Sequence, residues 1–273
     1  TVSPTYARQI VWPEQGHGLD QQLRARGADL SGILNGLDVE KWNPARDPLI
    51  PTRFTAEDLA GKRECKAVLQ RELGLREQAD LPLFGLVSRV DHQKGIDLVG
   101  GVAPFLVEQG AQLVVLGSGQ RALLEPLQSL ARAWRQSVAV SEGVDDQLAH
   151  RIYAGSDFFL MPSRFEPCGL GQMIALRYGT IPLVHRTGGL ADTVTDVDES
   201  PDRGNGLVFD VPDAAGLRWA SERALTIFRD DRGRLEPIRQ RAMRVDFSWD
   251  HSASAYDRVL SRAVAVERRR VLS

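Results

Sequence analysis

The sequence has 273 residues, 42% of them apolar, which is enough to bury a substantial core. Its net charge of −2, with both signs interspersed, excludes the clustered basic surface typical of nucleic-acid-binding proteins. Two cysteines favour a reducing, cytoplasmic location over a disulfide framework, and no apolar run reaches the roughly 20 residues that would cross a bilayer.

The first 80 residues carry few signals of regular structure. The chain opens on TVSPTYARQ, which has no Met and suggests a sequence entered midway, with no helix or strand before a proline-containing loop. The turn-rich stretch GILNGLD (32–38) follows, and residues 53–73 show the pattern of a helix.

From Leu83 onward, short apolar runs alternate with amphipathic stretches of helical length. Near-continuous apolarity is typical of strands buried on both faces, so the alternation predicts an α/β, Rossmann-like doubly wound parallel sheet. The predicted strands are 83–90, 111–119, 137–143, 157–163, 181–186 and 206–211. The predicted helices between them are 95–109, 120–134, 145–156 and 169–178.

After residue 212 the pattern changes to helices alone. Apolar residues recur at helical spacing in 213–230, 234–245 and 251–270, which predicts extra C-terminal helices. The segment 196–206, rich in Asp, Pro, Gly and Asn, is predicted to be an exposed loop. Its Asp196 and Asp198 mimic a metal-binding pair, but a surface turn is the preferred interpretation.

The stretch PSRFEPCGLGQ (162–172) places polar residues between a predicted strand and a predicted helix. Unpaired amides at a helix N-terminus attract a phosphate, and glycines such as Gly169 allow a ligand to approach the backbone. Glu166 cannot bind phosphate, but its carboxylate can accept hydrogen bonds from sugar hydroxyls. The alternative is that Glu166 only adds favourable charge to the start of the helix.

A second such stretch, SRVDHQKGIDL (88–98), follows the first predicted strand. Arg89 and Lys94 stand before a helix N-terminus, where the helix dipole disfavours positive charge. That cost is explained if the two cations bind a diphosphate, although a solvated loop remains an alternative. The five histidines show no i, i+4 pairing, and no G-x-S-x-G motif is present, so neither a metal site nor serine-hydrolase chemistry is expected.

Five motifs in order resemble the bacterial glycogen synthase family, which is closely similar to plant starch synthases. They are GILNGLD, SRVDHQKGIDL, RIYAGSDFFLMPSRFEPCGL, ALRYGTIPLVHRTGGLADTV and VDFSWDHSASAY. The resemblance implies a GT-B glycosyltransferase that transfers glucose from ADP-glucose to the non-reducing end of an α-1,4-glucan, with retention of configuration. It also implies that neither a metal nor another cofactor is needed.

The resemblance assigns roles to particular residues. Arg89 and Lys94 match the residues that bind the diphosphate and stabilise the ADP leaving group, and Glu166 matches the carboxylate that holds the donor glucose. Asn35 matches an asparagine that contacts this glucose, and Gly143 matches a glycine of the adenine pocket. The backbone of three further residues matches the loop that touches sugar and phosphate: Cys168, Gly169 and Leu170.

Two departures from the family pattern bear on function. Val144 stands where an aromatic residue usually stacks on adenine, so the base preference is open and UDP-glucose is an alternative donor. The family's amino-terminal domain, with its Lys-x-Gly-Gly-Leu motif, does not precede TVSPTYA here. A catalytically inactive fragment that only binds a nucleotide sugar is therefore the second alternative.

The same resemblance predicts a division of the chain. Residues 1–35 would form the end of the amino-terminal domain and the interdomain linker, and 36–250 the Rossmann-like donor-binding domain. Residues 251–273 would be a helix that crosses back to the missing domain, so it is expected to expose an apolar face.

Overall fold

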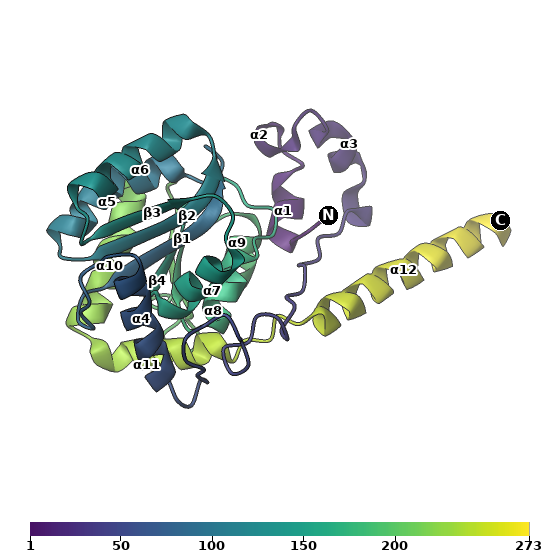
Figure 1. Ribbon diagram of the computed structural model, residues 1–273. Coiled ribbons are helices and arrows are strands. Elements are labelled where there is room, and N and C mark those ends of the chain that lie inside the picture. Colours follow the sequence, from purple (N-terminus) through teal and green to yellow (C-terminus); the bar gives the residue numbers. More distant parts are fainter. Residues whose placement is uncertain (273) are drawn as a thin grey trace.

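The computed structural model describes residues 1–272, with side chains except at residues 232 and 269–272. A six-stranded parallel sheet forms its centre, in the order β3-β2-β1-β4-β5-β6 (Figure 1). The strands are β1 (Leu83–Val90), β2 (Gln112–Gly119), β3 (Val138–Glu142), β4 (Phe158–Met161), β5 (Ile181–His185) and β6 (Leu207–Phe209). The predicted parallel sheet is confirmed, and every predicted strand is present within three residues of its predicted bounds.

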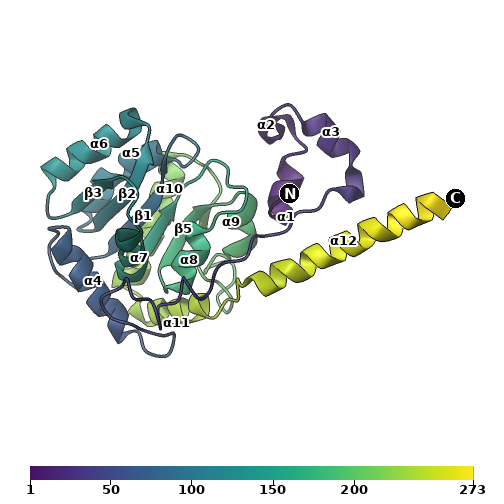
Figure 2. The ribbon, with the colours of Figure 1, turned by 45° about the vertical axis from the view of Figure 1, so that its right-hand side comes forward.

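Helices cover both faces of the sheet. One apolar core lies under α5 (Ile96–Glu108), α6 (Arg121–Ala133) and α10 (Ala214–Arg229), together with α11 (Arg232–Met243). The other core lies under α4 (Ala60–Glu72), α7 (Asp146–Gly155) and α8 (Gly171–Arg177), on the opposite face (Figure 2). The doubly wound architecture is therefore confirmed.

Burial on both faces explains why the strands are so apolar. In β2, the consecutive residues Leu113, Val114 and Val115 are fully buried although their side chains point alternately to opposite faces. The strand order reverses between β1 and β4, and in open parallel sheets a ligand crevice forms at such a reversal, outside the carboxyl ends of the strands.

The first 30 residues contradict the expectation of an unstructured start. They form three short helices and one 3-10 turn: α1 (Pro4–Gln9), α2 (Pro13–Gly16), α3 (Asp20–Ala25) and η1 (Gly27–Asp29). Proline opens α1 and α2, where its fixed φ suits the first helical position. Helices of four to six residues are too short to show a helical repeat, which is why the pattern missed them.

Helix α1 packs against α9 (Gly188–Thr193), a short helix that the sequence pattern also missed. The backbone N–H of Thr5 donates to the Asp192 carboxylate at 2.9 Å, and the Thr5 hydroxyl donates to the same carboxylate at 2.6 Å. The N-terminal helices are therefore anchored to the sheet body at α9.

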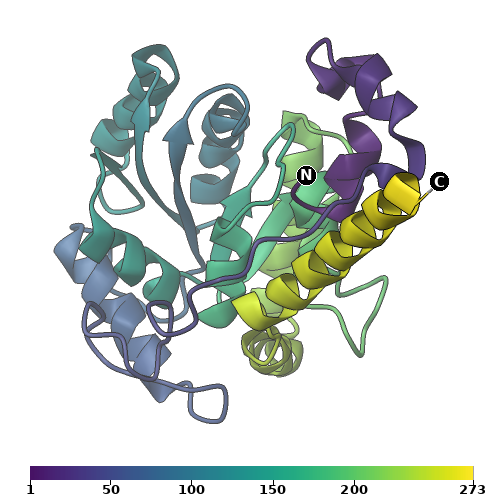
Figure 3. The ribbon, with the colours of Figure 1, turned by 90° about the vertical axis from the view of Figure 1, so that its right-hand side faces the viewer.

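The last helix, α12 (Trp249–Leu272), extends away from the sheet body and runs beside the N-terminal helices (Figure 3). The Arg262 guanidinium donates to the carbonyl of Ala28 at 3.2 Å. Tyr256, Leu260 and Val264 are exposed, which confirms the expected apolar face. Nothing tests the predicted division into 1–35, 36–250 and 251–273, which stays a prediction.

The chain enters and leaves the sheet body at one place, which we call the junction. The Leu37 N–H donates to the Phe247 carbonyl at 2.6 Å, and Leu37 forms an isolated parallel bridge with Ser248. A Cβ on Gly36 would lie 2.5 Å from the Cα of Trp249, so glycine permits the close approach of the two passages.

The segment 196–206 differs from the predicted exposed loop. Asp196 is buried, and its carboxylate accepts hydrogen bonds from the Val208 N–H at 2.7 Å and from the Arg223 guanidinium at 2.6 Å. Burial raises the pKa of Asp196, but Arg223 and the Val208 N–H outweigh it and lower the pKa. This aspartate therefore fastens the loop to β6 and α10, while residues 201–203 are exposed.

Within residues 1–272, no helix combines the length and the apolarity required to cross a membrane.

Candidate functional site

A cavity of about 260 Å³ opens at the carboxyl ends of β1 and β4. Its walls include Arg89 and Lys94 from the end of β1 and the turn after it, and Glu166 from the loop after β4. Gly169 and Leu170, which precede α8, complete that side. The structure therefore brings together five of the eight residues that the sequence analysis selected.

Lys94 and Glu166 form an ion pair inside this cavity. The Lys94 ammonium contacts one Glu166 carboxylate oxygen, which also accepts a hydrogen bond from the Ser163 hydroxyl at 3.1 Å. The Glu166 side chain is 7% exposed, whereas the Lys94 side chain is 17% exposed. An ammonium has three donors, so Lys94 can bind a phosphate oxygen while it holds Glu166.

Arg89 is much more exposed, with 68% of its side chain open to solvent. Its guanidinium pairs with Asp91 at 2.8 Å and donates to the Gln93 side chain at 3.3 Å. Exposed ion pairs of this kind contribute about 0–1 kcal/mol, so Arg89 can turn toward an anionic ligand at small cost.

The two loops that carry these side chains are fastened to each other. Arg164 donates two hydrogen bonds to the Asp97 carboxylate, at 2.8 and 2.7 Å, and a third to the His92 carbonyl at 2.7 Å. Gly95 has φ +68°, and a Cβ there would lie 2.2 Å from the Pro162 carbonyl oxygen. Glycine thus lets the loop after β1 touch the loop after β4, which sets the spacing of Lys94 and Glu166.

Residues outside the predicted site, Gly188, Gly189 and Gln172, contact the backbone of the loop that carries Glu166. A Cβ on Gly188 or Gly189 would lie 1.9 Å from the carbonyl oxygen of Glu166 or Cys168, respectively. The Gly189 N–H donates to the Glu166 carbonyl at 3.0 Å. The fully buried Gln172 amide donates to the carbonyls of Cys168 and of the next residue, at 3.1 and 2.9 Å. No local sequence pattern predicted these supports, although two adjacent glycines shortly after the predicted strand 181–186 were a usable signal.

A second cavity, of about 270 Å³, adjoins the first. It includes Gly143, which the sequence analysis assigned to a base pocket, together with Trp42 and Val144. Arg89 and Tyr153 line both cavities, so the two are neighbours along one crevice. Val144 is 91% exposed at the rim, and Gly143 has φ +130°, a backbone conformation that favours glycine.

Asn35 and Cys168 do not line either cavity. The Asn35 N–H donates to the Cys168 sulfur at 3.4 Å, so Asn35 contacts the loop that carries Glu166. Burial raises the pKa of the Cys168 thiol, which keeps it protonated and disfavours a role as nucleophile. Ligand contacts of the Asn35 side chain and the Cys168 backbone remain predictions.

In the described part of the chain, no three His, Cys, Asp or Glu side chains are grouped so that they could hold a metal ion. His185, at the end of β5, is buried, and its Nδ1 lies 2.8 Å from the Ser163 carbonyl oxygen. Burial lowers the pKa of His185, which favours a neutral ring that braces the loop after β4.

The parallel sheet, the crevice at its strand-order reversal and the paired Lys94 and Glu166 are compatible with a nucleotide-sugar-binding domain. The family model described as glycosyl transferases group 1 matches residues 73–235, more than half of the chain, so the chain belongs to this family of glycosyltransferases.

Curated relatives at about half identity carry the name glycogen synthase. The chain is 53% identical to a glycogen synthase of Anaeromyxobacter dehalogenans over 94% of its length, and 50% identical to one of Rhodospirillum rubrum over 97%. The match covers 54% of each relative. The chain thus spans about half the length of the curated relatives it matches.

Solved structures confirm the fold. The catalytic domain of starch synthase IV from Arabidopsis thaliana, bound to ADP and acarbose, aligns with a TM-score of 0.92 at 39% identity. The alignment covers 97% of this chain and 55% of that one. A sucrose-phosphate synthase from Thermosynechococcus elongatus aligns with a TM-score of 0.61 at 21% identity and shares the fold alone. The chain therefore corresponds to the carboxyl-terminal part of a GT-B glycosyltransferase.

Proposed function

We propose that this chain is the donor-binding half of a glycogen synthase-type glucosyltransferase. The complete enzyme would transfer glucose from ADP-glucose to the non-reducing end of an α-1,4-glucan with retention of configuration. The observation that carries the proposal is that Arg89, Lys94 and Glu166 line one cavity at the strand-order reversal. The glycogen synthase relatives and the ADP-bound starch synthase support it.

The geometry suggests a division of labour along the crevice. The nucleoside would occupy the cavity of Gly143 and Trp42, and the glucose would lie against Glu166, whose carboxylate accepts hydrogen bonds from sugar hydroxyls. The diphosphate would lie between them, near Arg89 and Lys94. As the glycosidic bond breaks, negative charge grows on the departing diphosphate, and these two cations stabilise it.

The amino-terminal domain that the family resemblance implies would bind the acceptor glucan and would supply part of the reacting centre. On this proposal the chain alone binds ADP and ADP-glucose, but it does not extend a glucan. Extension of an α-1,4-glucan by the chain alone would contradict the second statement and leave the first intact.

Binding of ADP to the chain tests the proposal directly. Lys94→Ala removes a charge-assisted hydrogen bond worth about 1.5–3 kcal/mol, so we expect the affinity for ADP to fall roughly tenfold to hundredfold in isothermal titration calorimetry. Arg71→Ala is the charge-matched control, because Arg71 pairs with Glu77 on the exposed side of α4. Equal affinities of the Lys94→Ala and Arg71→Ala variants for ADP would overturn the assignment.

The same titration addresses the choice of nucleotide. Stacking of a base on an aromatic side chain contributes about 1–3 kcal/mol, and Val144 offers no aromatic face. We therefore expect the difference in binding free energy between ADP and UDP to be smaller than this. Competition between ADP and UDP for the chain measures it. Tighter binding of UDP would favour UDP-glucose as the donor.

A further inference from the structure

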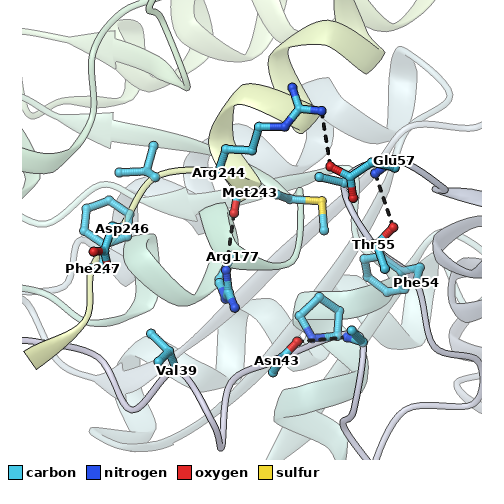
Figure 4. Close-up of a pocket in the computed structure, with 14 residues that line it drawn as sticks. Val39, Asn43, Phe54, Thr55, Glu57, Arg177, Met243, Arg244, Asp246 and Phe247 are labelled. Atoms are coloured by element: carbon cyan, nitrogen blue, oxygen red, sulfur yellow. Dashed lines mark hydrogen bonds and ion pairs between the residues drawn. The ribbon is translucent and has the colours of Figure 1, made fainter.

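A cavity of about 430 Å³ with no part in the proposed function lies beside the junction (Figure 4). Three parts of the chain form it: residues 39–57, the end of α8 at Arg177, and residues 243–247. The seven-residue helix α8 separates it from the cavity of Lys94 and Glu166, because Gly171 at the start of α8 lines that cavity.

Two hydrogen-bond donors within this cavity are poorly satisfied. Arg177 makes one long hydrogen bond, from Nη1 to the Met243 carbonyl at 3.4 Å, and its buried Nε has no partner among the described residues. Asn43 is buried, and its side-chain oxygen accepts from the Ala45 N–H at 3.1 Å. No described residue accepts from its amide NH₂. Of these donors, the Arg177 Nε is both buried and without a partner, and a buried unsatisfied donor is costly.

Two arginines, Arg177 and Arg244, and two carboxylates, Glu57 and Asp246, line the cavity, and both carboxylates lie at its exposed rim. The exposed Arg244 pairs with the exposed Glu57 at 3.3 Å. The exposed Asp246 carboxylate accepts a hydrogen bond from the Ser248 N–H at 2.8 Å. Asp246 interacts with the half-buried Arg177 guanidinium, but solvent screens exposed charges, so the rim carboxylates neutralise it less than a bound partner would.

The remaining walls are apolar. Figure 4 shows Arg177 and Asn43 between Phe247 on one side and Phe54 on the other, with Val39 below. An inorganic anion would leave these walls uncovered, whereas an aromatic or aliphatic group would bury them.

We propose that this cavity binds a small organic anion. Its carboxylate or phosphate group accepts hydrogen bonds from Arg177 and Asn43, and its apolar body packs between Phe54 and Phe247. The proposal does not depend on the proposed function, because the two cavities share no residue.

Occupancy of this site would act on the junction. Val39 follows the incoming passage at Leu37, and Phe247 precedes the outgoing passage at Ser248. A ligand in contact with both therefore stabilises the hydrogen bond from the Leu37 N–H to the Phe247 carbonyl. Slower hydrogen exchange of the Leu37 amide is the expected signature.

The test uses phenyl phosphate as probe, in calorimetry with ADP at saturation, so that the crevice of Lys94 is occupied. Benzoate replaces the phosphate by a carboxylate, inorganic phosphate supplies the anionic group alone, and benzyl alcohol supplies the apolar body alone. We expect phenyl phosphate or benzoate to bind at least about tenfold more tightly than either half, since both parts of the site are then used. Equal affinity for all four probes, or no binding of any, would refute the site.

Arg177→Gln should lower the affinity for the tighter probe about tenfold or more, because a charge-assisted hydrogen bond is lost. Arg241→Gln is the matched control, since Arg241 donates to the Gly204 carbonyl and does not line the cavity. Lys94→Ala should also leave the affinity unchanged, which separates this site from the crevice. An equal loss in Arg177→Gln and Arg241→Gln would contradict the proposal.

Circular dichroism identifies a variant that does not fold. If Arg177→Gln is unfolded, Asn43→Asp tests the site instead. Its carboxylate still accepts from the Ala45 N–H, but it repels an anion or pairs with Arg177, so the affinity for the probe should fall. Unchanged probe affinity in a folded Asn43→Asp variant, or unchanged exchange of the Leu37 amide with probe bound, would overturn the corresponding part of the proposal.

Discussion

The two ends of the sheet each carry a lysine–carboxylate pair, and the pairs differ in their surroundings. At the amino end, Asp157 accepts from Lys66 at 2.6 Å, from Arg239 at 2.6 Å and from the Leu83 N–H at 2.9 Å. At the carboxyl end, Glu166 accepts from Lys94 and Ser163 beside an open cavity.

The difference separates stability from ligand binding. The Lys66 ammonium donates to Asp157 and to two backbone carbonyls, those of Ala79 and Leu81, so all three of its donors have a partner. Lys94 donates to one carboxylate, and within the described chain its ammonium has no second acceptor. A saturated pair holds the fold, whereas an unsaturated pair beside a cavity can exchange partners with a ligand.

The largest expected effect is at the amino end. Asp157→Asn leaves Lys66 and Arg239 buried without a counter-charge, so the free energy of unfolding should fall by about 3–5 kcal/mol in urea denaturation. Glu77→Gln, which breaks the exposed pair with Arg71, is the control and should lower the free energy of unfolding far less, because solvent screens the pair. Similar losses in the two variants would remove the distinction between a buried and an exposed pair.

Acid should weaken the same pair. Burial raises the pKa of Asp157, but Lys66 and Arg239 outweigh it and hold the pKa below its ordinary value of 3.8. A carboxyl with a lowered folded-state pKa stabilises the protein fully above that ordinary value and loses the contribution as the pH falls through the folded-state pKa.

Other carboxylates titrate in the same range, so the measurement is a difference. The free energy of unfolding of the wild type minus that of Asp157→Asn should be constant near neutral pH and shrink below about pH 4. A difference that persists undiminished in acid would show that the charge of Asp157 is not what stabilises the fold.

Glycine 189 tests the support beneath the carboxyl-end site. In Gly189→Ala the new Cβ would lie 1.9 Å from the Cys168 carbonyl oxygen, so the loop of Glu166 must move. We expect a loss of about 1–3 kcal/mol in stability, together with weaker binding of ADP. Gly100→Ala in α5, where nothing lies within 4 Å of the new Cβ, should instead be neutral or stabilising. Unchanged ADP affinity in Gly189→Ala would mean that the loop position does not govern binding.

Glu166→Gln should change the stability less than Asp157→Asn. Lys94 keeps contact with solvent at the cavity and can hydrate its ammonium, so the free energy of unfolding should fall by less than the roughly 3–5 kcal/mol expected for Asp157→Asn. A loss as large as that of Asp157→Asn would make both ends of the sheet structural and contradict the comparison.

The sequence was most informative where one local rule determined the structure. All six strands were predicted because burial on both faces requires apolar residues in an unbroken run, as in Leu113–Val115. The meeting of Arg89, Lys94 and Glu166 was predicted because parallel strands end at one edge of the sheet.

Long-range contacts could not be predicted in this way. The supports of the Glu166 loop, Gln172 and Gly189, act through backbone contacts that no local pattern encodes. The segment 196–206 has the composition of a surface turn, but its Asp196 is buried because Arg223, 27 residues later, donates hydrogen bonds to it. The helices α1 to α3 and α9 were missed because four to six residues cannot show a helical period.

The junction has a consequence for how the chain could be rearranged. Leu37 and Ser248 lie side by side, so the polypeptide between them begins and ends at neighbouring points. Neighbouring ends of this kind suit circular permutation, with a short linker that joins position 248 to position 37 and new ends opened in an exposed turn such as 201–203.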